Sequence, residues 1–114
     1  MIKYKYYYSS IGRVFKFLIP ERKRILFYGF HNIQSLQQLN PASAVCVDND
    51  GNYMLNGLNG ASGISVVHYK YKDYITDAKY DYIVLDCAVG KTEDINLLLQ
   101  NVLKACERHT RVII

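Results

Sequence analysis

A chain of 114 residues, half of them hydrophobic and 21% charged, can form one domain with a core of its own, and this composition excludes disordered and collagen-like proteins. No apolar stretch approaches the roughly 20 residues of a membrane-spanning helix, and the N-terminus lacks the apolar core of a secretory signal. We therefore expect a single cytoplasmic domain, residues 1–114, without a transmembrane segment. The net charge of +4 is uneven, because seven basic residues and one acid fall within the first 24 residues.

The first predicted element is a basic amphipathic helix over residues 1–20. Apolar residues, many of them tyrosines, recur at intervals of three and four from Tyr4 to Leu18, and Pro20 ends the helix because proline has no amide hydrogen. Lysines and arginines lie opposite this apolar face. The helix either packs on the body of the domain or lies on a membrane interface, and its basic face is either solvated or meets an acidic partner. We expect no nucleic-acid ligand.

Residues 24–114 form the predicted α/β core. Apolar runs at 24–30, 43–50, 64–71, 80–87 and 110–114 predict strands, and residues 32–40 predict a helix that Asn40-Pro41 closes. A second helix begins at Thr92, a suitable capping residue, with Glu93 and Asp94 in its first turn. The apolar residues at helical spacing in this second helix are Ile95, Leu98, Leu99, Val102, Leu103 and Cys106.

The predicted strands are apolar along their whole length, which is typical of a parallel sheet buried on both faces. Strands that alternate with helices or loops form right-handed β-α-β units. The pattern therefore predicts a doubly wound sheet of strand order 3-2-1-4-5, flanked by helices.

Cysteine and histidine residues are scattered and do not have the spacing of metal ligands. We predict buried free thiols in a reducing compartment and no metal site. The residues concerned are Cys46, Cys87, Cys106, His31, His68 and His109.

Ligands of doubly wound sheets bind outside the carboxyl ends of the strands, which gathers residues 28–33, 48–50, 69–73 and 86–90 around one crevice. Gly29 allows the backbone to turn sharply after the first strand. Asp48 ends the second strand, where a carboxylate accepts hydrogen bonds from ribose hydroxyls. Asp48 is either such a ligand or a strand-end acid that has lost this role.

Three stretches resemble the class I S-adenosylmethionine-dependent methyltransferases, and most of all the small bacterial members found near, or fused to, sugar-transfer enzymes. Residues 7–29 resemble their leading helix and first strand, "AVCVDND" resembles their second strand, and residues 79–114 resemble the fourth strand, the next helix and the start of the fifth strand. The resemblance implies a Rossmann-like fold, S-adenosylmethionine as cofactor and a small-molecule methyl acceptor. It assigns no catalytic residue, and it gives Asp81 a structural role.

The resemblance implies a cofactor site at Gly29, His31, Asp48, Asn49 and Tyr69. Gly29 and Asp48 match the motif of the family. His31 replaces a family glycine, and it either shapes the loop or contacts the ligand. Tyr69 takes the place of an acid near the adenine, where its ring can stack on a purine.

Two further departures bear on activity. Phe27 replaces an acid of the first strand, and Ile33 replaces another glycine. Side chains on His31 and Ile33 would either crowd the space that the family leaves to the methionine portion of the cofactor or force a different loop path. The chain also ends in the fifth strand, whereas the family continues to a seventh. It is either a fragment or a reduced domain. The alternative to a methyltransferase is therefore an inactive interaction or regulatory module, and the open strand at 110–114 can pair with a partner protein or a second copy.

Overall fold

The computed structural model describes residues 18–29, 38–49, 63–85 and 92–114. Most of the predicted N-terminal helix and of the predicted helix at 32–40 lies outside these residues, as do His31, Ile33 and Cys87.

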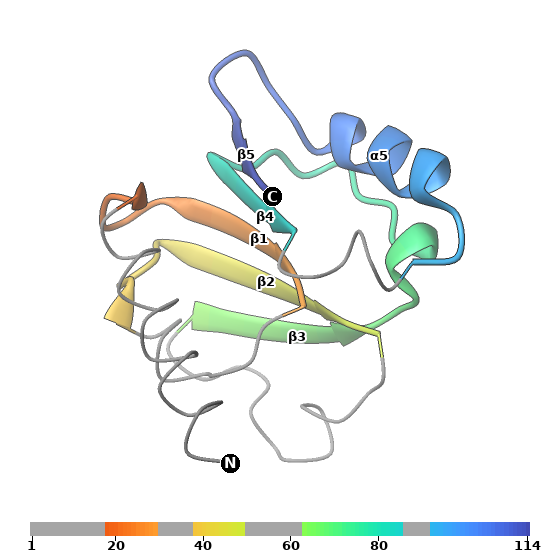
Figure 1. Ribbon diagram of the computed structural model, residues 1–114. Coiled ribbons are helices and arrows are strands. Elements are labelled where there is room, and N and C mark those ends of the chain that lie inside the picture. The colour runs from red at the N-terminus through yellow and green to blue at the C-terminus, as the bar shows by residue number, and fades with distance from the viewer. Residues whose placement is uncertain (1–17, 30–37, 50–62, 86–91) are drawn as a thin grey trace, which may run out of the picture.

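The described residues contain the predicted sheet. Its strands are β1 (Arg24–Tyr28), β2 (Ser43–Asp48), β3 (Ile64–His68), β4 (Tyr82–Leu85) and β5 (Arg111–Ile113). They are all parallel and follow the order β3-β2-β1-β4-β5, as Figure 1 shows. The predicted α/β fold with strand order 3-2-1-4-5 is therefore confirmed.

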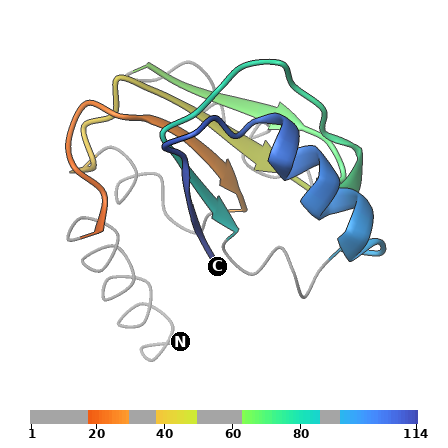
Figure 2. The same cartoon turned by 90° about the horizontal axis from the view of Figure 1, so that it is seen from above.

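Successive residues of a strand point to opposite faces of the sheet. Both faces carry buried residues. On one face the sheet packs against helix α5 (Ile95–Lys104) and the 3-10 turn η2 (Tyr71–Asp73), and we call this the α5 face (Figure 2). Its strand residues include Leu26, Tyr28, Val47, Ile83 and Leu85. On the opposite face the core consists of Ile19, Ile25, Phe27, Leu39, Ala44, Cys46, Ile64, Val66 and Val84.

Helix α5 begins later than the sequence predicts. Asp94, not Thr92, is the N-cap: its Oδ1 atom accepts a hydrogen bond of 3.0 Å from the amide of Leu97. Glu93 and Asp94 therefore precede the first turn. Aspartate is at least as good an N-cap residue as threonine. Its negative charge also interacts favourably with the helix dipole.

The buried face of α5 is also rotated from the predicted one. Leu98 and Val102 are buried as expected, but Asn101 and Ala105 are buried with them, whereas Leu99 and Leu103 are exposed. The rotation has a polar cause: the Nδ2 atom of Asn101 donates a 2.7 Å hydrogen bond to the carbonyl of Lys72, which holds α5 against η2.

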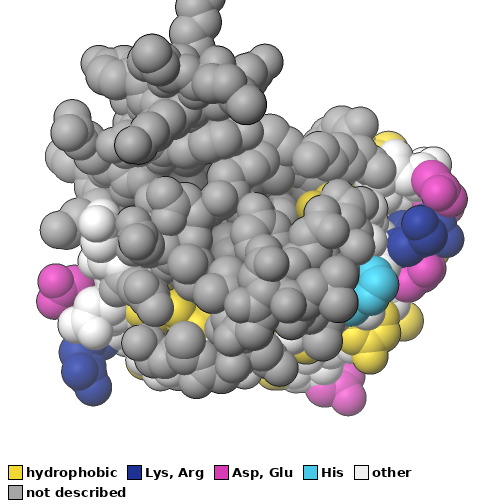
Figure 3. Space-filling view, turned by 90° about the horizontal axis from the view of Figure 1, so that it is seen from below, with side chains coloured by type: hydrophobic (Ala, Val, Ile, Leu, Met, Phe, Trp, Pro, Cys, Tyr) yellow, Lys and Arg dark blue, Asp and Glu magenta, His cyan; other side chains and the backbone are white. Residues whose placement is uncertain are grey.

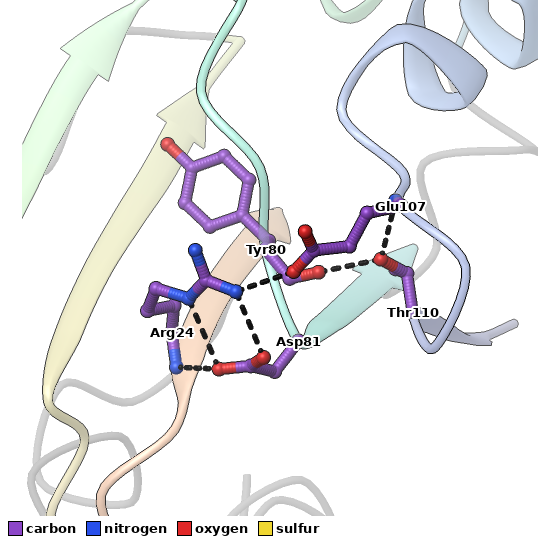
Figure 4. Close-up of polar contacts among 5 residues, drawn as sticks. All are labelled: Arg24, Tyr80, Asp81, Glu107 and Thr110. Carbon is purple, nitrogen blue, oxygen red and sulfur yellow. Dashed lines mark hydrogen bonds and ion pairs between the residues drawn. The ribbon is translucent and has the colours of Figure 1, made fainter.

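A polar cluster fixes the amino ends of β1 and β4. The Asp81 carboxylate accepts hydrogen bonds from the backbone amide, Nε and Nη2 of Arg24, at 2.9, 3.2 and 3.0 Å (Figure 4). Arg24 also donates to Glu107, and the Thr110 hydroxyl donates to the carbonyl of Tyr80 at 2.6 Å. These contacts tie β1 to β4 and to the segment before β5, and they agree with a structural role for Asp81.

Replacing Asp81 with asparagine is expected to lower the free energy of unfolding by up to about 1 kcal/mol at neutral pH, because this solvent-exposed ion pair loses its charge. The hydrogen bonds from Arg24 hold the pKa of the Asp81 carboxyl below its ordinary value. This stabilisation is therefore present above about pH 4 and disappears as the pH falls through the lowered pKa.

Urea unfolding at a series of pH values measures this difference. The matched control is Asp77→Asn, an exposed aspartate whose loss is expected to change little. If Asp81→Asn and the parent still differed in the free energy of unfolding at the lowest pH, the effect would come from the changed side-chain geometry and not from the lost charge.

Candidate functional site

The carboxyl ends of β1 and β2 bring Gly29 and Asp48 together. Gly29 follows β1 with a φ of 79°, a conformation that favours glycine. Its amide donates a 3.1 Å hydrogen bond to the carbonyl of Val47, the residue before Asp48. Gly29 is therefore joined directly to the end of β2.

Asp48 is almost wholly buried, with 4% of its surface exposed. Ala44 and Cys46 of the same strand pack in the core on the face opposite α5. Every second residue of a strand points to the same face, so the Asp48 side chain points to that face too. A buried carboxylate needs polar partners, and Asp48 has contacts within the protein. The end of β2 therefore carries a buried carboxyl group that has contacts within the protein.

His68 is a neighbour of Asp48 that the sequence analysis did not select. The register pairs Asp48 with His68 at the ends of β2 and β3, and paired residues of parallel strands point to the same face. His68 is exposed. The sequence alone did not point to it, because its place beside Asp48 depends on the register of β2 and β3.

Asn49 has a structural contact in the described residues. Its Oδ1 atom accepts a 3.1 Å hydrogen bond from the amide of Tyr71, so the end of β2 is tied to η2. The adjoining cavity measures about 20 Å³, which holds about one water molecule and no cofactor. It is lined by Asn49, Lys70, Tyr71, Lys72, Thr92 and Glu93.

Tyr69 lies just past β3 with 49% of its surface exposed. Its ring packs against Tyr74, with centroids 5.3 Å apart and planes inclined at 59°. Tyr74 packs on the core of the α5 face, whereas Asp48 points to the opposite face. The structure thus joins Gly29 to Asp48 but gives Tyr69 a different packing partner. His31, the remaining predicted site residue, lies outside the described residues.

Tyr28, the last residue of β1, is fully buried, and its hydroxyl has no hydrogen-bond partner within the described part of the chain. Burial raises the pKa of this hydroxyl, which is therefore neutral. The ring meets Tyr71 and Tyr74 edge to face, at centroid distances of 6.2 and 6.3 Å. Tyr28, Tyr71 and Tyr74 therefore pack together on the α5 face, near the carboxyl end of β1.

Seen from the side of β3, the carboxyl edge of the sheet shows mixed chemistry. In Figure 3, where this edge is at the right, hydrophobic, basic and acidic side chains lie beside a histidine.

The amino edge of the sheet carries a separate groove of about 440 Å³. It is lined by Lys23, Asp81, Tyr82, Arg108, His109, Thr110 and Arg111. Cofactors of doubly wound sheets bind at the carboxyl edge, so this groove is not the candidate cofactor site.

Among the described residues, no cluster of three or more histidine, cysteine, aspartate or glutamate side chains has a geometry that could hold a metal ion. The same residues include no helix with the length and hydropathy to cross a membrane.

No family model and no curated protein matches the sequence. Solved structures do match. A methyltransferase from Haloferax volcanii, solved in complex with the Trm112 methyltransferase activator, has a TM-score of 0.69 and 13% identity, over 82% of this chain and 45% of that chain. A methyltransferase from Thiobacillus denitrificans, solved in complex with S-adenosyl-L-homocysteine, has a TM-score of 0.62 and 13% identity, over 92% of this chain and 45% of that chain.

A third similar structure is an S-adenosylmethionine-dependent methyltransferase from Mesorhizobium loti, with a TM-score of 0.64 and 14% identity, over 76% of this chain and 43% of that chain. Together with the strand order, these matches show that the chain has the fold of the class I S-adenosylmethionine-dependent methyltransferases. It spans a little under half the length of these proteins.

Proposed function

We propose that this chain binds S-adenosylmethionine at the carboxyl ends of β1 and β2 and is the cofactor-binding half of a methyltransferase. One observation carries the proposal: Gly29, which follows β1, donates a hydrogen bond to Val47, the residue before the buried Asp48. Two of the similar structures, from Thiobacillus denitrificans and Geobacter sulfurreducens, were solved with S-adenosyl-L-homocysteine.

The residues present suit part of the cofactor. The Asp48 carboxylate would accept hydrogen bonds from the ribose hydroxyls, and the exposed Tyr69 ring offers a face to a purine. The cofactor supplies a sulfonium that is already activated toward methyl transfer, so the protein mainly has to hold donor and acceptor in line. The acceptor would be a small molecule, and the expected compartment is the cytoplasm.

The alternative is an inactive domain that binds a partner protein. Three observations favour it. Strand β5 pairs with β4 on one side only within the described residues, and the Haloferax volcanii structure is a complex with an activator protein. Replacement of two family glycines by His31 and Ile33 also fits a lost cofactor loop.

Calorimetric titration of the purified chain with S-adenosylmethionine and S-adenosyl-L-homocysteine separates these functions. The proposal predicts saturable binding of both, with adenosine binding more weakly because it lacks the amino-acid portion. A folded chain that binds none of them at millimolar ligand would exclude cofactor binding by this chain and favour the partner-binding domain.

A further inference from the structure

The groove at the amino edge of the sheet lies apart from the candidate cofactor site. Its walls come from three segments, at the starts of β1, β4 and β5. These strands are neighbours in the order β1-β4-β5, so the groove spans three strands and does not follow the outer edge of β5. Its volume of about 440 Å³ falls within the range of small-molecule sites, roughly 300–1,000 Å³.

Positive charge dominates this groove. Lys23, Arg108 and Arg111 line it, and His109 adds a side chain that gains a further positive charge when it is protonated. Among the described residues that line the groove, Asp81 is the only acid. A groove with this lining attracts anions.

The acids beside the groove are already engaged by Arg24. Its guanidinium donates hydrogen bonds to both oxygens of Asp81 and to Glu107 (Figure 4). The pKa of Asp81 is lowered, mainly by the hydrogen bonds from Arg24 and also by the charge of Lys23, so Lys23 acts on the same carboxylate. Within the described part of the chain, Arg108 forms no ion pair.

The local balance of charge is therefore positive. Four cations, including Arg24, face the carboxylates of Asp81 and Glu107. The balance would be neutralised by a ligand that carries about two negative charges, the charge of a phosphate monoester near neutral pH.

Backbone hydrogen bonds hold the basic residues in place. The amide of Glu107 donates to the Thr110 hydroxyl at 2.8 Å, and the amide of Thr110 donates to the Glu107 carbonyl at 3.0 Å. These two bonds close a turn that carries Arg108. The amide of Arg111 donates to the carbonyl of Asp81 at 3.0 Å. A ligand would therefore have to order side chains but little backbone, which lowers the entropic cost of binding.

We propose that this groove binds a small molecule that carries a phosphate monoester. The guanidinium groups of Arg108 and Arg111 can each donate paired hydrogen bonds to phosphate oxygens, and Lys23 supplies a further positive charge. Tyr82 adds an aromatic ring against which the organic part of the ligand can pack. The site does not rest on the proposed function, because no candidate cofactor residue lines the groove.

Titration of the ¹⁵N-labelled protein with ribose 5-phosphate at physiological ionic strength tests the proposal. We expect the amides of Lys23, Thr110 and Arg111 to shift in a saturable manner, with a dissociation constant in the millimolar range or below. Ribose, which lacks the phosphate, is expected to cause no shift. Absence of these shifts at millimolar ribose 5-phosphate, or equal shifts with ribose, would overturn the proposal.

Charge-removing variants locate the contact. Arg108→Gln and Arg111→Gln each remove one guanidinium from an exposed position, and each is expected to raise the dissociation constant for ribose 5-phosphate at least fivefold. The matched control is Lys104→Gln, which removes a positive charge from the exposed end of α5, outside the groove, and should leave the affinity unchanged. Circular dichroism confirms that each variant is folded.

Two results with these variants and a second ligand would contradict the proposal. One is equal affinity for ribose 5-phosphate in Arg108→Gln, Arg111→Gln and the parent. The other is a single-stranded oligonucleotide that binds the same residues at least tenfold more tightly than ribose 5-phosphate, because the groove would then be part of a nucleic-acid surface. Titration of the same samples with S-adenosyl-L-homocysteine is a separate readout, so either proposal can fail alone.

Discussion

Asp48→Ala is expected to weaken the binding of S-adenosylmethionine by about 1–3 kcal/mol, because hydrogen bonds from ribose hydroxyls to a carboxylate are charge-assisted. The loss should appear equally for S-adenosyl-L-homocysteine, since both ligands carry the same ribose. Calorimetric titration measures it.

Two further variants separate binding from folding. Asp48 is buried, so Asp48→Asn keeps its volume while removing the charge, and circular dichroism confirms that each variant is folded. Asp73→Ala removes an exposed carboxylate from η2, at the same edge, and is expected to leave the affinity unchanged. Equal affinity in Asp48→Asn, Asp48→Ala and the parent would remove Asp48 from the cofactor site.

Asn101→Leu is expected to lower the free energy of unfolding by about 2 kcal/mol. The substitution nearly preserves volume but removes the donor that serves the Lys72 carbonyl at 2.7 Å, and a polar group left without its hydrogen bond away from water costs about 1–3 kcal/mol. Urea unfolding followed by circular dichroism measures the change.

The matched control lies one residue away. Gln100 is exposed on the same helix, so Gln100→Leu should change the stability by less than about 0.5 kcal/mol. If Asn101→Leu proved as stable as the parent, the link between α5 and η2 would contribute nothing, and the rotation of α5 would need another cause.

The sheet was predictable from the sequence because its signal is local and repeated. Each strand is a short apolar run, and runs without alternation indicate burial on both faces. The polar ends of the runs then indicate the edge at which ligands bind. Gly29 and Asp48 were selected in this way, since each lies near the end of an apolar run.

Helix α5 was harder to predict because the spacing of its apolar residues did not show which of them the sheet would cover. The predicted face included Leu99 and Leu103, but the protein exposes both and buries Asn101 and Ala105 beside Leu98 and Val102. One hydrogen bond, from Asn101 to Lys72, selects between the two faces. A contact between residues 29 positions apart leaves no trace in local spacing. The same holds for His68, whose place beside Asp48 depends on the register of two strands.

The N-cap of α5 illustrates a smaller ambiguity. Thr92 and Asp94 both suit the position, and local sequence does not distinguish them. The structure selects Asp94, through its bond to the amide of Leu97, and buries the Thr92 hydroxyl without a hydrogen-bond partner in the described residues.

The central claim is that S-adenosylmethionine binds where β1 and β2 end. Titration of ¹⁵N-labelled protein with S-adenosyl-L-homocysteine, followed by amide chemical shifts, tests it most directly. We predict that the amides of Gly29, Asp48 and Asn49 shift in a saturable manner, while those of Lys23 and Arg111 at the amino edge do not. Absence of any shift at millimolar ligand, or shifts confined to the groove at the amino edge, would contradict the account.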